Sequence, residues 1–277
     1  MKKILVPVDF SAPSENALKV ASNLAKRNDA QLCVLHVIEL AETLFGSEQF
    51  NVDDEQIVFF MKMAKKRFGK FMDKDFLKGV DYKDMVDIGP TSKYISEYAR
   101  KEDVDMIVMG STGVSGLEEV LIGSNTEKIV RTSSVPVLVV KKKMDDLAIK
   151  QVVFASDFDL ESLKAYENAK QFADSFNAQL KLLYVNLPGN QFYSTQEIHD
   201  RMREFLHEAE VELNESNVVI YNDYTIQLGV INGSNSLKAD LIAMPTHGRQ
   251  GLSHFFNGSI GEDVVNHSTL PVITFKI

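Results

Sequence analysis

The residues best suited to chemistry form a glycine-rich loop in the first half of the chain. Gly110 and Gly113 follow a short apolar run. After nine further residues, Gly123, Ser124 and Asn125 open a helical pattern. Glycine tolerates positive φ and lets backbone N–H groups approach an anion closely. The loop therefore predicts a two-sided cradle for phosphate, because the free N–H groups and dipole of a helix N-terminus also favour that group.

Two residues near this loop also fit a purely structural role. Ser124 opens the sequence Ser-Asn-Thr-Glu, which matches a capping box, so Ser124 either contacts phosphate or caps its own helix. Asp9 ends the first apolar run, where it contacts a ligand, caps the first helix or satisfies backbone groups at the end of the strand. The sequence leaves these alternatives open for both residues.

The chain contains two copies of one sequence pattern. Residues Ile4–Val37 match Val152–Val185 at an offset of 148. The later parts match at an offset of 135, with Gly123-Ser124 on Gly258-Ser259, so the second copy is 13 residues shorter. We expect one domain at residues 1–143 and another at residues 150–277, joined by a charged connector.

Short apolar runs alternate with helical patterns in each copy. In the first copy these runs are Ile4–Val6, Leu32–Val37, Met85–Ile88, Met106–Met109 and Val135–Val140. The alternation predicts an α/β fold made of two open parallel sheets with helices on both faces. We expect the copies to pack together through their last strands, Val135–Val140 and Pro271–Lys276, because an apolar edge strand needs covering.

The second copy is expected to lack one helix. Only 10 residues separate Gly229 from Asp240, against 15 between Gly89 and Asp105. The stretch Asn232–Ser236 in that interval consists of helix breakers. The sequence therefore predicts a short turn or loop where the first copy has its third helix.

The glycine-rich loop and both ends of the first copy resemble a known family. The spacing Gly-x-x-Gly, nine residues, Gly-Ser is similar to the ATP-binding motif of the universal stress protein family, and so are the opening Ile4–Ser11 and the ending Ser134–Val140. The resemblance covers both copies and implies a tandem protein with a five-stranded, Rossmann-like parallel sheet in each copy. It also implies ATP, with or without Mg²⁺, as the ligand and a homodimer as a candidate assembly.

The resemblance assigns roles to individual residues. It implies that the adenine lies against Pro7, Asp9, Val37 and Met109, and that the triphosphate lies at Gly110, Gly113, Gly123, Ser124 and Asn125. Val37 and Met109 suit the core of any sheet, and only the resemblance makes them candidates. The first copy therefore has a full set of candidate nucleotide-binding residues.

The second copy departs from this pattern. Pro245 replaces the first loop glycine, so it offers no N–H group and holds φ near about −65°. The equivalent positions give a candidate second site: Asp157, Val185, Gly248, Arg249, Gly258 and Ser259. Arg249 either adds a phosphate contact or is an exposed loop arginine. We expect the second copy to bind nucleotide much more weakly than the first, or not at all.

No sequence motif indicates a catalytic centre. The chain has no GxxxxGK[ST] loop, no G-x-S-x-G elbow, no HExxH pair and no metal-ligand spacing of His and Cys. We therefore expect an adenine-nucleotide-binding regulatory protein of the stress response, with slow ATP hydrolysis at most. The alternatives are a weak ATPase, a nucleotide-free scaffold that dimerises, and a nucleotidyl transferase.

Charge and composition narrow the partners and the compartment. A net charge of −9 disfavours nucleic acid and an anionic membrane surface as partners. No apolar stretch approaches the ~18 residues of a transmembrane helix. Cys33 is the only cysteine and cannot form an internal disulfide, so we expect a cytoplasmic protein.

Overall fold

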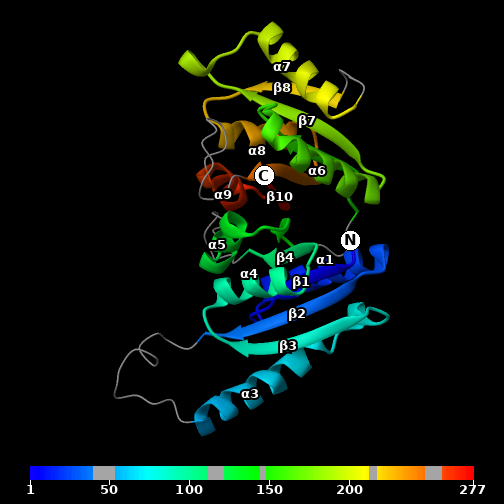
Figure 1. Ribbon diagram of the computed structural model, residues 1–277, viewed down its shortest axis with the longest axis vertical. Helices are drawn as coiled ribbons and strands as arrows, with labels where there is room; N and C mark the ends of the chain where they lie inside the picture. The colour runs from blue at the N-terminus through cyan, green and yellow to red at the C-terminus, as the bar shows by residue number, and fades with distance from the viewer. Residues whose placement is uncertain (40–53, 112–121, 144–147, 212–216, 247–257) are drawn as a thin grey trace.

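Ten strands form one continuous sheet in the computed structural model, which describes residues 1–39, 54–111, 122–143, 148–211, 217–246 and 258–277. The strand order is β3-β2-β1-β4-β5-β10-β9-β6-β7-β8, and helices cover both faces of the sheet (Figure 1). Every neighbouring pair is parallel except β5 and β10. The predicted α/β fold is confirmed, and the two five-stranded sheets are joined edge to edge.

The elements follow one another in the same order in both halves of the chain. The first repeat contains β1 (Lys3–Pro7), α1 (Ala12–Asn28), β2 (Gln31–Ile38), α3 (Asp54–Met72), β3 (Tyr82–Ile88), α4 (Thr91–Lys101), β4 (Met106–Gly110), α5 (Ser124–Thr132) and β5 (Val137–Val140). The second repeat contains β6 (Gln151–Ala155), α6 (Leu163–Ser175), β7 (Gln179–Asn186), α7 (Thr195–Glu208), β8 (Val218–Asn222), α8 (Ile226–Ser236), β9 (Leu241–Thr246), α9 (Gly258–His267) and β10 (Val272–Lys276).

Helix α1 begins where the chain leaves the first strand. The Ser11 hydroxyl oxygen accepts the N–H of Ser14 at 3.3 Å and so caps the helix. Three alanines at four-residue spacing, Ala17, Ala21 and Ala25, are all buried against the sheet. Small side chains on this stripe let α1 pack closely over β1 and β4, which fixes where its N-terminus lies.

The two repeats meet at their last strands. Strand β10 pairs antiparallel with β5, with Val272 opposite Val139 and Thr274 opposite Val137. Each strand would otherwise leave an apolar edge with unpaired backbone groups. The expected internal pairing is therefore present, and it joins the two sheets through backbone hydrogen bonds.

The expectation of a turn or loop in place of the third helix of the second repeat is wrong. Helix α8 has 11 residues, as α4 does, and it runs through the stretch of helix breakers. Its first turn is capped by Thr225, whose hydroxyl oxygen accepts the N–H of Leu228 at 3.2 Å. Gly229 and Gly233 allow the helix to pack directly on β7, and this tertiary packing overrides the low helix propensity of the segment.

The register of the strands locates the true shortening of the second repeat. Val34 pairs with Asp84 in the first repeat, and its equivalent Leu182 pairs with Val218 in the second. The difference in residue number between equivalent residues of the two repeats is therefore 148 on the second strand and 134 on the third strand. The missing residues belong to the connection between these two strands, and α8 is complete.

We predict opposite effects for two glycine-to-alanine substitutions in helices. A Cβ atom on Gly229 would lie 2.3 Å from Cγ1 of Val185, so Gly229→Ala should lower the free energy of unfolding by about 1–3 kcal/mol. A Cβ atom on Gly69 in α3 has no atom within 4 Å, so Gly69→Ala should raise it by about 0.5–1 kcal/mol. Urea unfolding measures both. Stabilisation by both substitutions would contradict the close packing of α8 on β7.

Candidate functional site

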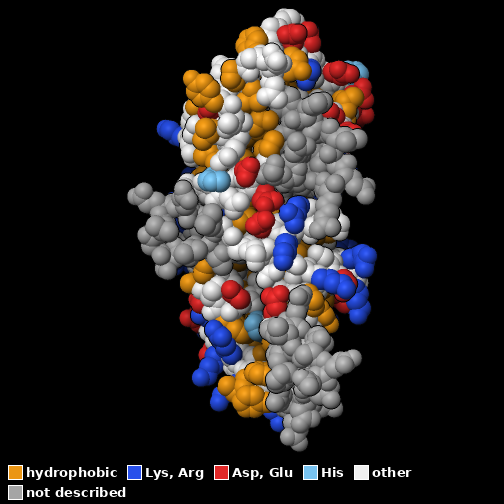
Figure 2. All heavy atoms as spheres, turned by 90° about the vertical axis from the view of Figure 1, so that its left-hand side faces the viewer, with side chains coloured by type: hydrophobic (Ala, Val, Ile, Leu, Met, Phe, Trp, Pro, Cys, Tyr) orange, Lys and Arg blue, Asp and Glu red, His pale blue; other side chains and the backbone are white. Residues whose placement is uncertain are grey.

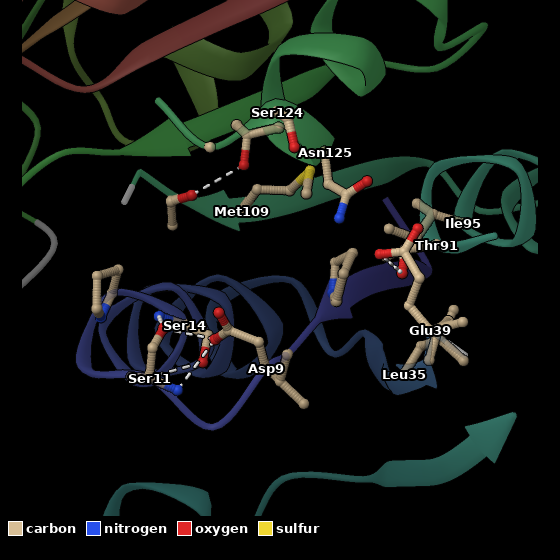
Figure 3. A pocket seen from close by; sticks show the side chains of 17 residues that line it. Asp9, Ser11, Ser14, Leu35, Glu39, Thr91, Ile95, Met109, Ser124 and Asn125 are labelled. Carbon is tan, nitrogen blue, oxygen red and sulfur yellow. Dashed lines mark hydrogen bonds between the residues drawn. The ribbon is translucent and has the colours of Figure 1, made fainter. Parts of the chain in front are cut away.

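A cavity of about 320 Å³ opens at the carboxyl ends of the strands in the first repeat (Figure 3). It lies where β1 and β4 are neighbours and the chain turns to opposite sides of the sheet, which is where ligands bind in open α/β sheets. Eight of the candidate residues line it: Pro7, Asp9, Val37, Met109, Gly110, Gly123, Ser124 and Asn125. The ninth, Gly113, lies outside the described residues.

One wall of the cavity is apolar. Val37 at the end of β2 and Met109 in β4 are both largely buried, and Pro7 ends β1 between them. Ile95 of α4 covers this wall from the neighbouring helix. Three adjacent strands and one helix thus form an apolar slot of the kind that holds a flat ring.

Gly110 has a different role from the one its position in the loop suggests. Its φ is not positive, so conformational freedom does not explain the glycine. A Cβ atom on Gly110 would lie 2.4 Å from the carbonyl oxygen of Pro13. The glycine therefore allows the end of β4 to touch the first turn of α1. Thr126 donates its hydroxyl to the Gly110 carbonyl at 3.1 Å and so ties α5 to the same strand end.

Helix α5 begins at the cavity without a side-chain cap. Its cap residue is Gly123, and no side chain of the described residues accepts its first N–H groups. Ser124 is the first helical residue and is exposed, so the capping-box interpretation of Ser124 is wrong. Ser124 and Asn125 both line the cavity (Figure 3). The positive end of the α5 dipole is therefore available to an anion.

Asp9 is held in a turn at the opposite side of the cavity from α5. Its Oδ1 accepts the N–H of Ser11 at 3.0 Å and also the Ser11 hydroxyl (Figure 3). Phe10 adopts a left-handed φ of 66°, which turns the chain from β1 into α1. Partial burial acts to raise the pKa of Asp9, but hydrogen bonds from Ser11 and Ser14 outweigh it and hold the pKa below its usual value. The carboxylate is therefore charged at neutral pH and can accept hydrogen bonds from a ligand.

Two polar residues of the cavity, Glu39 and Thr91, belong to no sequence motif. The Thr91 hydroxyl donates to Oε2 of Glu39 at 3.3 Å. Glu39 directly follows β2, and Thr91 begins α4 shortly after β3. The sequence could have indicated these two residues only through their places just after β2 and β3. The carboxyl ends of parallel strands meet at one edge of a sheet.

The described residues of the second repeat leave almost no space at the equivalent position. Among the described residues, the space beside Asp157 and Val185 is only about 10 Å³, less than one water molecule needs. Ile226 and Val230 of α8 line this small space. They are the equivalents of Thr91 and Ile95 in the first repeat. Asp157 itself is buried.

Other candidate residues of the second site are only partly described. Gly248 and Arg249 lie outside the described residues. Gly258 and Ser259 begin α9, the counterpart of α5. The structure therefore brings Asp157 and Val185 together but gives them no ligand-sized cavity within the described part of the chain.

The second repeat contacts the segment of the first repeat that leads into α5. Oδ1 of Asn266 in α9 accepts the N–H of Ile122 at 3.3 Å, one residue before Gly123. Lys141, just after β5, donates from Nζ to the carbonyl oxygen of Val265. Burial lowers the pKa of Lys141 to about 8. Helix α9 thus supports the segment from which α5 starts.

Both halves of the chain match the universal stress protein family, over residues 1–141 and 148–276, so the chain belongs to this family and has two such domains in tandem. Universal stress protein MJ0577 of Methanocaldococcus jannaschii is 34% identical over 155 residues, covering 51% of this chain and 96% of the relative. Universal stress protein MJ0531 of the same organism is 32% identical over 150 residues, covering 51% and 82%. A solved universal stress protein from Archaeoglobus fulgidus DSM 4304 has a TM-score of 0.77 at 24% identity, covers 99% of this chain and 98% of its own, and so shares the fold along the whole length.

The surface of the described residues gives two further facts. No described helix is long and apolar enough to cross a bilayer. Figure 2 looks at the side on which β2 and β3 end, and acidic and basic side chains are interspersed on the coloured part of that face. That part of the surface therefore carries no broad basic stripe of the kind that follows a nucleic-acid backbone.

We predict a pH-dependent contribution of Asp9 to stability. A carboxyl group whose pKa is lowered by folding stabilises the native state at pH values above its usual pKa of 3.8. It loses this contribution as the pH falls through the lower pKa of the folded state. Asp9→Asn should therefore be less stable than the wild type at pH 7, and the difference should shrink towards pH 3. Urea unfolding of both proteins across this range provides the measurement. A difference that stays constant or grows in acid would contradict the turn geometry.

Proposed function

We propose that the first repeat binds ATP or a closely related adenine nucleotide, and that the protein is a nucleotide-binding regulator of the stress response. The observation that carries this proposal is one cavity that combines an apolar slot, a charged acceptor and an uncapped helix N-terminus. Its volume of about 320 Å³ falls in the range of small-molecule sites. The adenine ring fits the slot formed by Pro7, Val37 and Met109.

The charges of the cavity orient the nucleotide. Asp9 and Glu39 line the cavity and accept hydrogen bonds, which suits the amino group of adenine and the hydroxyls of ribose. The N-terminus of α5, with Ser124 and Asn125, attracts phosphate. Carboxylates repel phosphate, so the ligand binds with its phosphate groups towards α5.

Mg²⁺ fits this site only as a companion of the phosphates. The described residues hold no cluster of three or more acidic, histidine or cysteine side chains that could form a protein cage for a cation. Mg²⁺ commonly keeps several waters and binds through substrate phosphates. The proposed site therefore accepts either free ATP or its magnesium complex.

Binding with little or no turnover is the proposed chemistry. Phosphoryl transfer relies on lysine, arginine or metal ions that neutralise charge as it develops. The described residues that line the cavity include carboxylates, hydroxyls and an amide but no lysine, arginine or histidine. Slow hydrolysis of ATP is the most that this set supports.

The second repeat is proposed to act as a structural partner. Its equivalent space of about 10 Å³ favours the nucleotide-free scaffold role for this half of the chain. Its last strand and α9 both support the first repeat, through β5 and Ile122. The proposed setting is the cytoplasm, which suits a chain with one buried cysteine, and a homodimer is the proposed assembly.

Two matched substitutions test the proposed site. Asn125→Asp is nearly isosteric and stabilises a helix N-terminus, but it places a negative charge where the phosphates bind. We expect it to lower ATP affinity by about tenfold or more, because a lost charged hydrogen bond and a repulsion act together. Ser259→Asp adds the same charge at the start of α9 and should leave ATP affinity unchanged.

Isothermal titration calorimetry gives the affinity and the number of sites. We expect one ATP per chain for the wild type and for Ser259→Asp. A wild type that binds no ATP, or an equal loss in both variants, would contradict the proposal. Two sites of equal affinity would contradict the difference between the repeats.

A further inference from the structure

We propose that the groove between α4 and α5 is a second binding site in the first repeat, for the oxyanion of inorganic phosphate or of a small phosphomonoester. The groove is an open hollow of about 180 Å³. Its described lining consists of three basic and three hydroxyl side chains: Ser92, Lys93, Ser96, Lys128, Arg131 and Thr132. No acidic side chain belongs to this lining. This site does not depend on the proposed nucleotide site.

Helix geometry explains why these side chains converge. Ser92 and Ser96 are four residues apart on α4, and so are Lys128 and Thr132 on α5. Residues at this spacing lie on one face of a helix. Helices α4 and α5 pack side by side (Figure 1), so the two faces enclose the groove.

The basic side chains of the groove are incompletely neutralised. The Nε–H of Arg131 is shielded from solvent and has no hydrogen-bond acceptor among the described residues. Lys93 meets Glu97 at 3.8 Å, at the limit of an ion pair, and its side chain is 71% exposed. An exposed pair of this length binds weakly and leaves Lys93 available to another anion.

Glu262 of α9 is an acidic neighbour of Arg131 from the second repeat. Burial of Glu262, followed by its contact with Glu127, raises the pKa of Glu262 to about 7. At neutral pH this acid is therefore only partly charged and neutralises Arg131 only in part. A dianionic phosphate offers the arginine a stronger partner, because guanidinium groups bind phosphate through paired hydrogen bonds.

The second repeat shows that the fold does not require basic residues in this groove. At the offset of 135, the positions of Lys93, Lys128 and Arg131 are occupied by Leu228, Asp263 and Asn266. The same two helices, α8 and α9, pack together there without any of the three cations. The positive charge is thus a property of the first repeat that the packing of the two helices does not require.

Titration of the full chain with inorganic phosphate, followed by NMR, tests whether phosphate binds in the groove between α4 and α5. In ¹⁵N-labelled protein, the Nε–H resonance of Arg131 reports phosphate binding directly. This resonance is assigned by its absence from the spectrum of Arg131→Lys. We expect this resonance to shift in a saturable manner as phosphate is added. A parallel titration with O-phosphoserine distinguishes the two sources of the oxyanion, since the tighter probe identifies the natural ligand class.

Two neutralising variants complete the test. Lys128→Gln removes an exposed charge from the groove and should weaken phosphate binding by about tenfold, as read from the Arg131 resonance. Arg100→Gln removes an exposed charge from α4 outside the groove and should leave the affinity unchanged. An Arg131 resonance that responds to neither probe would overturn the proposal. Equal affinity in Lys128→Gln and the wild type would overturn it as well.

Discussion

The packing of one helix against the sheet determines whether a repeat has room for a ligand. In the first repeat Tyr98 of α4 belongs to the buried apolar cluster that includes Cys33 and Leu35 of β2, and Tyr94 packs against the same cluster. In the second repeat the equivalent positions are Gly229 and Gly233, which touch the side chains of β7 directly. The cavity volumes follow this difference, at about 320 Å³ and about 10 Å³.

The same packing difference distinguishes the structural contributions of the two repeats. In the described part of the second repeat, a close helix–sheet contact takes the place of the cavity, and this repeat also contacts the first repeat. Strand β10 completes the edge of β5, and Asn266 holds the backbone at Ile122. The contact of Asn266 lies next to the start of α5, where the proposed phosphate site begins. The second repeat therefore supports the cavity-lining segment of the first repeat by direct contact.

The sequence was sufficient for the features that depend on local patterns. The offsets of 148 and 135 located the repeats, and the apolar runs located the strands, because each signal lies in residues close along the chain. The loop spacing and the family resemblance together named eight residues that the structure brings to one cavity.

Features that depend on packing between distant segments could not be predicted. The helix-breaking residues of α8 adopt a helix because its glycines pack against Val185 and Leu183 of β7. Rules based on neighbouring residues in the sequence cannot predict this contact. Gly110 is explained by the carbonyl of Pro13, nearly a hundred residues earlier in the chain, and not by its own φ. Glu39 and Thr91 belong to no motif and meet only through the order of the strands.

The central claim is that one repeat holds a nucleotide and the other holds the site in place. A crystal structure of the full chain with a non-hydrolysable ATP analogue tests it most directly. The account predicts one nucleotide per chain, with its ring between Pro7 and Met109 and its phosphates at the N-terminus of α5, and no nucleotide beside Asp157. A nucleotide bound beside Asp157, or a ring placed at α5 with the phosphates towards Asp9, would contradict it.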